Sequence, residues 1–244
     1  MRGAGMTREK RLFDVPRPYV PVSGSDLQFP VHRIYCVGRN YAAHARESGA
    51  DPDREAPFYF MKPADAAVPN GSRIPYPSRT HDLQHEIELV VAIGKGGRDI
   101  SPGDAPGHIF GYAVGIDLTR RDLQTEAKNA GRPWDTSKGF DQAAPVSAIH
   151  TVEQIGHPAR GRIWLEVNGR LRQEGDLGEL IWSVPEAVAE LSTLFALAPG
   201  DLIFTGTPAG VNALEPGDRV TGGVDGVDEI SIEIGEPSPP LFEE

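Results

Sequence analysis

Apolar and polar residues alternate with a period of two in several stretches of the chain, and this alternation predicts short β-strands. The signal is sharpest in residues 163–175, where two alternating runs are joined by Asn168-Gly169, a dipeptide typical of a type I′ hairpin turn. Apolar runs predict further strands at 34–38, 58–63, 86–94 and 110–117. Residues 201–211 and 215–234 are predicted to form additional strands separated by glycine turns.

Helical patterns are fewer and shorter. The composition of residues 38–49 favours a short helix that ends at Gly49, and residues 118–131 are predicted to form a second helix. Residues 183–197 have a helical period, with Pro185 near the start and Pro199 just past the end. The segment 68–78 is rich in proline, glycine and serine and is predicted to be a loop.

The 22 prolines and 28 glycines among 244 residues favour many turns over long helices. We therefore predict a β-rich α+β fold. A chain of this length can bury one full core, and no flexible linker divides it. We predict a short N-terminal extension over residues 1–30 and a single catalytic domain over residues 31–244.

Three carboxylates carry the strongest chemical signal. Glu86 and Glu88 stand two apart in a strand that is otherwise apolar, so both side chains point to the same face, and Asp117 ends the next predicted strand. Two buried carboxylates repel each other unless a cation lies between them. An all-oxygen site suits Mg²⁺ or Mn²⁺. The alternative is a solvated glutamate face on an edge strand.

A second signal is the pair His44 and Glu47, three residues apart on one face of the predicted helix. A carboxylate bonded to imidazole raises its basicity, which suits a general base that activates water. A plain surface pair is the alternative. Residues 42–56 have few large apolar side chains, so we expect this segment to close over a bound substrate. His81 and His85 lack the HExxH pattern, which argues against zinc.

The overall charge narrows the class of partner. The formal charge of −11 and pI of about 5.1 argue against binding to nucleic acid or an anionic membrane. The single Cys36 excludes an intrachain disulfide and fits a reducing compartment. No apolar stretch reaches membrane-spanning length, and no apolar segment follows the basic residues near the N-terminus. We therefore predict a cytoplasmic protein with a small-molecule substrate.

Seven ordered motifs together resemble the fumarylacetoacetate hydrolase superfamily, from about Ile34 to Glu236. The similarity is greatest to its small members, the fumarylpyruvate hydrolases and the acylpyruvases that also decarboxylate oxaloacetate. The motifs are GRNYAAHARESG, FYFMKPADA, HEIELVVAIG, GYAVGIDLTRRDLQ, GRPWDTSKGFDQAAPVS, VNGRLRQEG and GDLIFTGTPAGV.

The resemblance implies a roll of mixed β-sheets with a few short helices, assembled as a homodimer. It implies that Glu86, Glu88 and Asp117 bind Mg²⁺ or Mn²⁺, and that His44 with Glu47 activates water. It also implies which residues contact the substrate. Lys138 would face the metal-bound substrate, Arg121 and Gln124 would be polar contacts, and Thr207 would contact the oxo-acid carboxylate. Two further cations, Arg39 and Lys62, flank these segments and could bind a dianion or have structural roles.

The implied reaction is hydrolysis of the carbon–carbon bond of a 2,4-dioxo acid, with fumarylpyruvate of aromatic (gentisate) catabolism as the first candidate. Decarboxylation of oxaloacetate, or isomerisation of a related oxo-diacid, would use the same metal site without a hydrolytic water. The pair His44 and Glu47 favours hydrolysis. A non-catalytic binding protein on the same fold is the remaining alternative.

Overall fold

The computed structural model describes residues 12–47 and 56–237, without the side chains of residues 45–47. The predicted helix end at Gly49 and most of the segment expected to close over substrate therefore lie outside the described residues. Within the described part, the strands form four sheets, of which two are large.

The larger sheet has eight strands, and its path runs in the order β4-β3-β15-β8-β9-β11-β5, with β12 also paired to β9. It is mixed, because β3 pairs with β15 and β5 with β11 in parallel while the other pairings are antiparallel. Its strands are β3 Arg33–Gly38, β4 Phe58–Lys62, β5 Ala67–Pro69, β8 Ile87–Ile93, β9 Ile109–Ile116, β11 Ala144–Val146, β12 His150–Thr151 and β15 Asp201–Phe204.

The second large sheet has five strands in the order β14-β13-β17-β18-β6. The predicted hairpin is its β13–β14 pair, and both turn residues have positive φ, 54° at Asn168 and 72° at Gly169. This is the backbone that a type I′ turn requires, so the prediction is confirmed. The strands are β6 Arg73–Pro75, β13 Arg162–Val167, β14 Arg170–Asp176, β17 Arg219–Val224 and β18 Asp228–Gly235.

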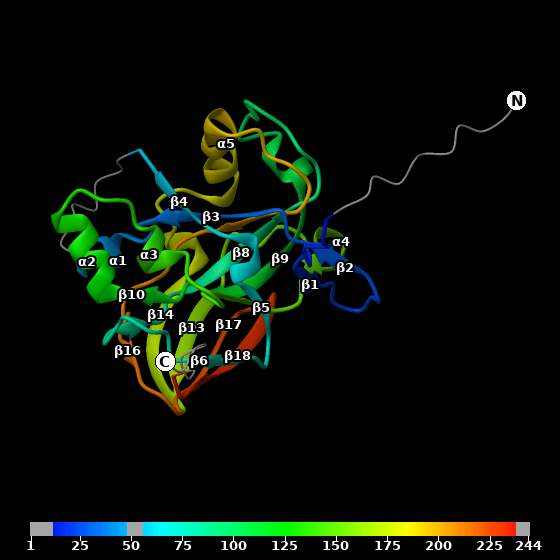
Figure 1. Cartoon of the computed structure of the whole chain (residues 1–244). Helices are drawn as coiled ribbons and strands as arrows, with labels where there is room; N and C mark the ends of the chain where they lie inside the picture. The colour runs from blue at the N-terminus through cyan, green and yellow to red at the C-terminus, as the bar shows by residue number, and fades with distance from the viewer. Residues whose placement is uncertain (1–11, 48–55, 238–244) are drawn as a thin grey trace, which may run out of the picture.

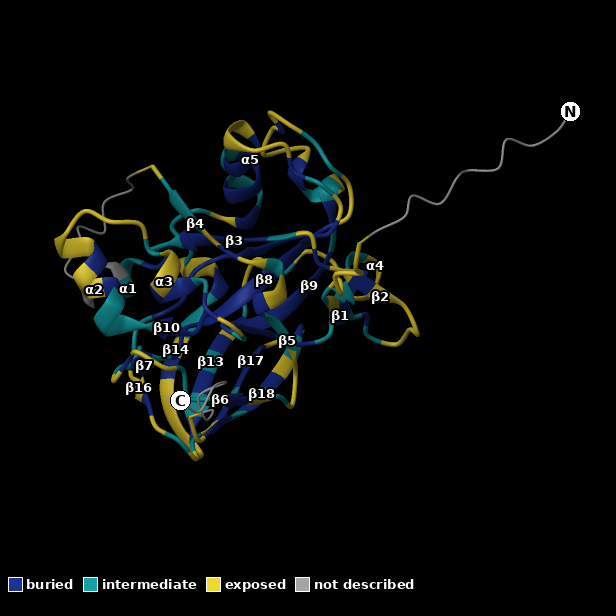
Figure 2. Cartoon of the chain, in the orientation of Figure 1, coloured by how far each residue is buried: buried dark blue, intermediate teal, exposed yellow. Residues whose placement is uncertain are grey.

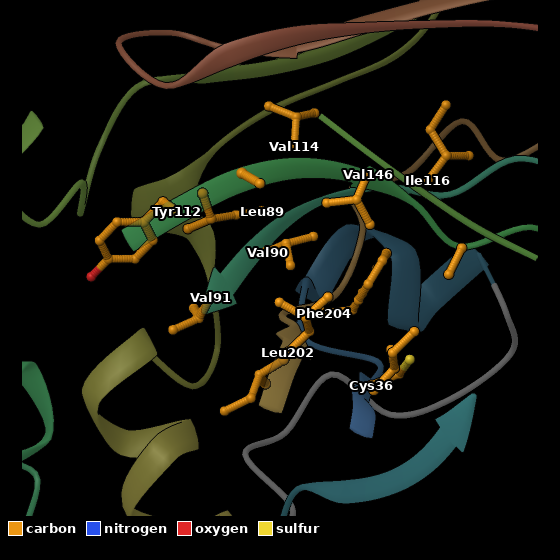
Figure 3. Close-up of a cluster of buried hydrophobic side chains, with 14 of the residues drawn as sticks. Cys36, Leu89, Val90, Val91, Tyr112, Val114, Ile116, Val146, Leu202 and Phe204 are labelled. Atoms are coloured by element: carbon orange, nitrogen blue, oxygen red, sulfur yellow. The ribbon is translucent and has the colours of Figure 1, made fainter. Parts of the chain in front are cut away.

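The core lies between these two sheets, where β13, β17 and β18 contact β8 and β9 (Figure 1). Every residue of β8 is buried, because both faces of this central strand are covered. Figure 3 shows Leu89, Val90 and Val91 among side chains of β3, β9, β11 and β15, and Figure 2 shows β8 and most of β9 as buried. Strand β13 alternates between buried and more exposed positions, as expected where one face meets the core.

The smaller elements complete the roll. Two minor sheets are β1–β2 and β10-β7-β16. Their strands are β1 Tyr19–Pro21, β2 Gln28–Pro30, β7 Leu83–Gln84, β10 Thr119–Arg120 and β16 Ala213–Leu214. The helices are α1 Ala42–Glu47, α2 Arg121–Asn129, α3 Asp135–Lys138, α4 Val152–Ile155 and α5 Val184–Leu194, with 3-10 turns η1 Ala64–Ala66, η2 Ala105–His108 and η3 Leu177–Glu179. The β-rich α+β class and the mixed sheets are thus as predicted.

Helix α5 begins where the sequence indicated. Ser183 and Glu186 form a capping box, and Pro185 occupies the first turn, where its missing N–H costs nothing. The helix packs beside β4, and the Tyr59 hydroxyl donates to the Ala187 carbonyl at 3.2 Å. Figure 1 shows α1, α2 and α3 grouped at one end of the large sheet, beside β10.

The sequence prediction differs from the structure in the segment 68–78. This segment contains most of β5 and all of β6 rather than only loop, and these strands pair with β11 and β18 respectively. Both are three-residue edge strands, where proline is tolerated because one side of the backbone needs no partner. Local composition could not show these partners, which are distant in sequence.

Residues 12–30, part of the predicted N-terminal extension, include β1 and β2, and Val20 and Phe29 join the hydrophobic core. Among the described residues, no helix has the length and apolar character needed to span a membrane.

Candidate metal centre and active site

One pocket brings most of the predicted site residues together. It lies where β3, β8 and the segment after β15 meet helices α1, α2 and α3. Its lining includes eight of the eleven predicted residues, which are Arg39, His44, Glu86, Glu88, Arg121, Gln124, Lys138 and Thr207. Asp117 and Lys62 lie directly beneath this lining. The side chain of Glu47 lies outside the described residues, so its pairing with His44 stays a prediction.

The three carboxylates converge as the alternating pattern predicted. Oxygen atoms of Glu86, Glu88 and Asp117 all lie within 4.8 Å of one another. Glu86 immediately precedes β8, Glu88 lies on it, and Asp117 follows the paired strand β9. The backbone N–H of Asp117 donates to the Glu86 carbonyl at 2.8 Å, which fixes the two strand ends against each other.

Cations partner two of these carboxylates. The Lys138 ammonium lies 2.7 Å from Glu86 Oε2, 2.7 Å from Asp117 Oδ2 and 2.6 Å from the Thr119 hydroxyl. Lys62 Nζ lies 2.7 Å from the other Asp117 oxygen, and the Arg121 guanidinium contacts Glu86. Burial opposes ionisation of Glu86, but the charges of Lys138 and Arg121 outweigh it and lower its pKa well below the usual range.

Glu88 differs from its two neighbours. Only 2% of it is exposed, and its Oε2 accepts a 2.7 Å bond from the Gly206 N–H. Among the described residues, no lysine, arginine or histidine lies within ion-pair distance of Glu88. Burial and the charges of Asp117 and Glu86 raise its pKa well above the usual range. A divalent cation at the convergence point would supply the missing positive charge, so the donor set fits a hard, oxygen-ligated ion such as Mg²⁺ or Mn²⁺.

The substrate-side predictions Arg121, Gln124 and Thr207 all line the pocket. Arg121 begins α2, and its guanidinium donates to Gln84 at 2.7 Å and Gln124 at 2.6 Å as well as contacting Glu86. Arg121 and Gln124 are one turn apart on the same helix face. Thr207 lies across the pocket, after β15, and His44 on α1 lines the same space.

Lys62 is placed beneath the pocket rather than in it. It is 1% exposed, and besides Asp117 its ammonium contacts the backbone carbonyls of Leu118 and Lys138. Of the two roles left open by the sequence, these contacts favour the structural one. Lys62 holds Asp117, the loop after β9 and the end of α3 together.

Substitution Lys62→Met should lower the free energy of unfolding by about 3 kcal/mol, because it removes one partner of a buried ion pair and leaves two carbonyls without a donor. Urea denaturation in the presence of EDTA measures this. The matched variant Lys95→Met, at an exposed lysine, should change stability by less than about 0.5 kcal/mol. Equal stability of the two variants would show that the buried pair is not what holds Asp117.

A polar network behind Thr207 was not predicted. Gln173 on β14 is fully buried, and its Oε1 accepts from the Ile87 N–H at 3.1 Å while its Nε2 donates to the Pro208 carbonyl at 2.8 Å. These two backbone groups fix the amide orientation. His85 Nδ1, 2.8 Å from Oε1, must therefore carry the proton, and Thr207 Oγ1 must accept from Nε2 at 2.8 Å. The Thr207 hydroxyl proton is left to donate elsewhere.

Substitution Gln173→Leu should therefore destabilise the fold by at least about 3 kcal/mol, since two buried donors and two acceptors would lose their partner. The exposed neighbour Arg172→Leu is the control and should be nearly neutral. Urea denaturation distinguishes them. A loss below about 1 kcal/mol for Gln173→Leu would mean that water replaces the amide and that the network is not rigid.

The structure also adds Lys128 to the pocket lining, a residue the sequence did not single out. It follows Gln124 by four residues on α2, so helical periodicity could have placed it on the same face. Its ammonium lies 5.0 Å from the centre of the Trp134 ring. Partial burial and the charges of Arg121 and Arg39 lower the pKa of Lys128 to about 8.

The chain is similar to known proteins. Residues 33–235 match the family model described as fumarylacetoacetate (FAA) hydrolase C-terminal. The chain is 45% identical over 185 residues to a fumarylpyruvate hydrolase of Ralstonia sp, covering 76% of this chain and 96% of that protein. It is 41% identical over 204 residues to the human mitochondrial oxaloacetate tautomerase FAHD1, covering 84% and 92% respectively.

A solved structure is also similar to this chain. The crystal structure of fumarylpyruvate hydrolase from Pseudomonas aeruginosa, in complex with Mn²⁺ and pyruvate, superposes with a TM-score of 0.92 at 51% sequence identity. The match covers 93% of this chain and 100% of that one.

Proposed function

The chain belongs to the fumarylacetoacetate hydrolase family, and from this premise we propose that it hydrolyses a 2,4-dioxo acid, with fumarylpyruvate as substrate and fumarate and pyruvate as products. The observation that carries the proposal is the buried acidic triad, whose Glu88 has no cationic partner among the described residues, at a pocket that His44 also lines. Similarity to a fumarylpyruvate hydrolase that binds Mn²⁺ and pyruvate supports a substrate with a pyruvate end.

Glu86, Glu88 and Asp117 would hold the Mg²⁺ or Mn²⁺ ion, which supplies Lewis-acid polarisation of the 2-oxo-carboxylate group when bound. Lys138 and Arg121 keep Glu86 ionised. The two cations thus keep this one ligand in its charged form. Thr207 has a hydroxyl proton to donate, and we assign it to the carboxylate of the substrate's pyruvate end.

His44 is the proposed general base. Its imidazole takes a proton from water, and the resulting hydroxide attacks the C4 carbonyl of the dioxo acid. The C3–C4 bond then breaks, its electron pair goes to C3, and C3 regains a proton from the imidazolium. One water is consumed and no other reactant is needed. Glu47 would orient the ring, and Lys138 and Gln124 would stabilise negative charge that develops on the substrate oxygens.

Oxaloacetate chemistry is the second candidate function. It is favoured by the 41% identity to a protein named oxaloacetate tautomerase. Tautomerisation or decarboxylation needs proton transfer at C3 but no hydrolytic water. The cytoplasmic location, the role in aromatic catabolism and the homodimer remain predictions, of which the last can be checked by light scattering.

The two candidates are separated by substrate profiling of the purified protein with Mg²⁺ or Mn²⁺. Fumarylpyruvate, maleylpyruvate, acetylpyruvate and oxaloacetate are compared by loss of dioxo-acid or enol absorbance and by coupled detection of pyruvate. We expect the highest kcat/KM for fumarylpyruvate, with one pyruvate formed per substrate lost. Rapid loss of oxaloacetate enol without pyruvate, and no cleavage of any dioxo acid, would instead establish the tautomerase.

A further inference from the structure

The positive charges around the pocket divide into two groups. Lys62, Lys138 and Arg121 are each engaged with Glu86 or Asp117. Arg39 and Lys128 line the same pocket, yet within the described part of the chain neither has a carboxylate at ion-pair distance. Two cations in a pocket without acidic partners indicate a place where an anion from outside binds.

Neighbouring aromatic rings hold these two cations. The Arg39 guanidinium carbon lies 5.5 Å from the centre of the Phe58 ring, and the Lys128 ammonium lies 5.0 Å from the centre of Trp134. The two rings are in edge-to-face contact, with centres 5.5 Å apart. Cation–π contact fixes the side chains without neutralising their charge, so both remain able to bind a carboxylate.

The backbone supports this placement. Arg39 follows β3 with φ of 55°, a left-handed conformation that is uncommon outside glycine and asparagine and that persists at functional sites. On α2, Arg121, Gln124 and Lys128 share one helix face at spacings of three and four residues. Lys128 therefore stands about 10 Å further along the helix axis than Arg121, which contacts the metal ligand Glu86.

The exposure of Lys128 and the charges around it agree with binding of an external anion. Lys128 is exposed and lines the pocket, whereas Lys62 and Lys138 are buried. Partial burial, followed by the charges of Arg121 and Arg39, lowers the pKa of Lys128, and the charge of Glu86 offsets this effect only in part. A carboxylate placed between Lys128 and Arg39 would relieve this repulsion.

We propose that Arg39 and Lys128 form a carboxylate subsite, built on Phe58 and Trp134, that selects dioxo-diacids by binding the carboxylate at the end remote from the metal. The inference rests on the proposed function for the identity of the substrate. It assigns specificity for a diacid over a monoacid to two residues outside the metal centre.

The test uses two inert ligands of equal length. 2-Oxoheptanedioate has the carbon chain and terminal carboxylate of fumarylpyruvate but no C4 carbonyl to cleave, and 2-oxoheptanoate ends in a methyl group. Calorimetry with the Mn²⁺-loaded protein should show at least about tenfold tighter binding of the diacid, as expected for a charge-assisted carboxylate contact. Lys128→Met and Arg39→Met should each remove most of this preference and leave binding of the monoacid unchanged.

Two further variants make the outcome decisive. Lys128→Arg keeps the charge and should retain the preference, and Lys95→Met, an exposed lysine outside the pocket lining, should behave as wild type. Equal loss of both ligands in Lys128→Met, or an unchanged preference in it, would overturn the subsite. The proposed function fails separately, since it requires fumarylpyruvate turnover, whereas the ligand preference is measured without turnover.

Discussion

Substitution Glu88→Ala should weaken Mg²⁺ and Mn²⁺ binding by at least about 100-fold, because it removes one of three converging carboxylates. The metal-free fold should remain as stable as wild type or become more so. Glu88 is the carboxylate without a cationic partner in the described structure, and removing it relieves its repulsion with Asp117 and Glu86. Isothermal calorimetry measures the affinity, and urea denaturation in EDTA measures the stability.

The exposed variant Glu229→Ala controls for a general effect of lost negative charge and should bind metal as wild type does. A second variant, Glu88→Gln, keeps the shape and one oxygen ligand but not the charge. We expect it to bind metal more weakly than wild type and more tightly than Glu88→Ala. Wild-type affinity in Glu88→Ala would remove Glu88 from the metal site and with it the carboxylate-triad assignment.

The triad could be predicted from sequence because its signal is local. Glu86 and Glu88 are two residues apart in a run of apolar residues, and period-two geometry alone places them on one face. The Asn168-Gly169 hairpin and the start of α5 at Pro185 are equally local, since each depends on the backbone preferences of a few adjacent residues.

What the sequence could not resolve depends on contacts between distant segments. Lys62 lies at the end of an edge strand, and only the fold shows that its ammonium turns inward to Asp117. Gln173 belongs to a polar stretch, RLRQEG, in which the side chains on either side are exposed, yet it is buried against His85 and Thr207. In both cases a polar residue is buried because its partners come from other strands, which no local pattern encodes.

The roles of the individual cations also depended on the structure. The sequence indicated Arg121 and Lys138 as substrate-side positions and left Arg39 and Lys62 open between dianion binding and a structural role. The fold separates those that neutralise the metal ligands from Arg39, which has no acidic partner among the described residues, and adds Lys128 beside it. That separation distinguishes residues that build the metal centre from residues that can bind the end of the substrate remote from the metal.

The general-base assignment makes the second large prediction. Substitution His44→Ala should lower kcat for dioxo-acid cleavage by about two to four orders of magnitude, because water then lacks a positioned base. Metal affinity should hardly change, since His44 lines the pocket without belonging to the carboxylate triad. Stopped-flow absorbance and metal calorimetry on the same preparation measure the two quantities, with the exposed His81→Ala as control.

A mutant cycle with Glu47 tests whether the two residues act as one unit. If Glu47 only orients and polarises the imidazole, Glu47→Gln should lose less activity than His44→Ala, and the double variant should be no slower than His44→Ala alone. Fully additive losses would mean that Glu47 acts on substrate independently of the ring. If His44→Ala instead lost metal binding and activity together, His44 would be a metal ligand, and hydrolysis would need another base.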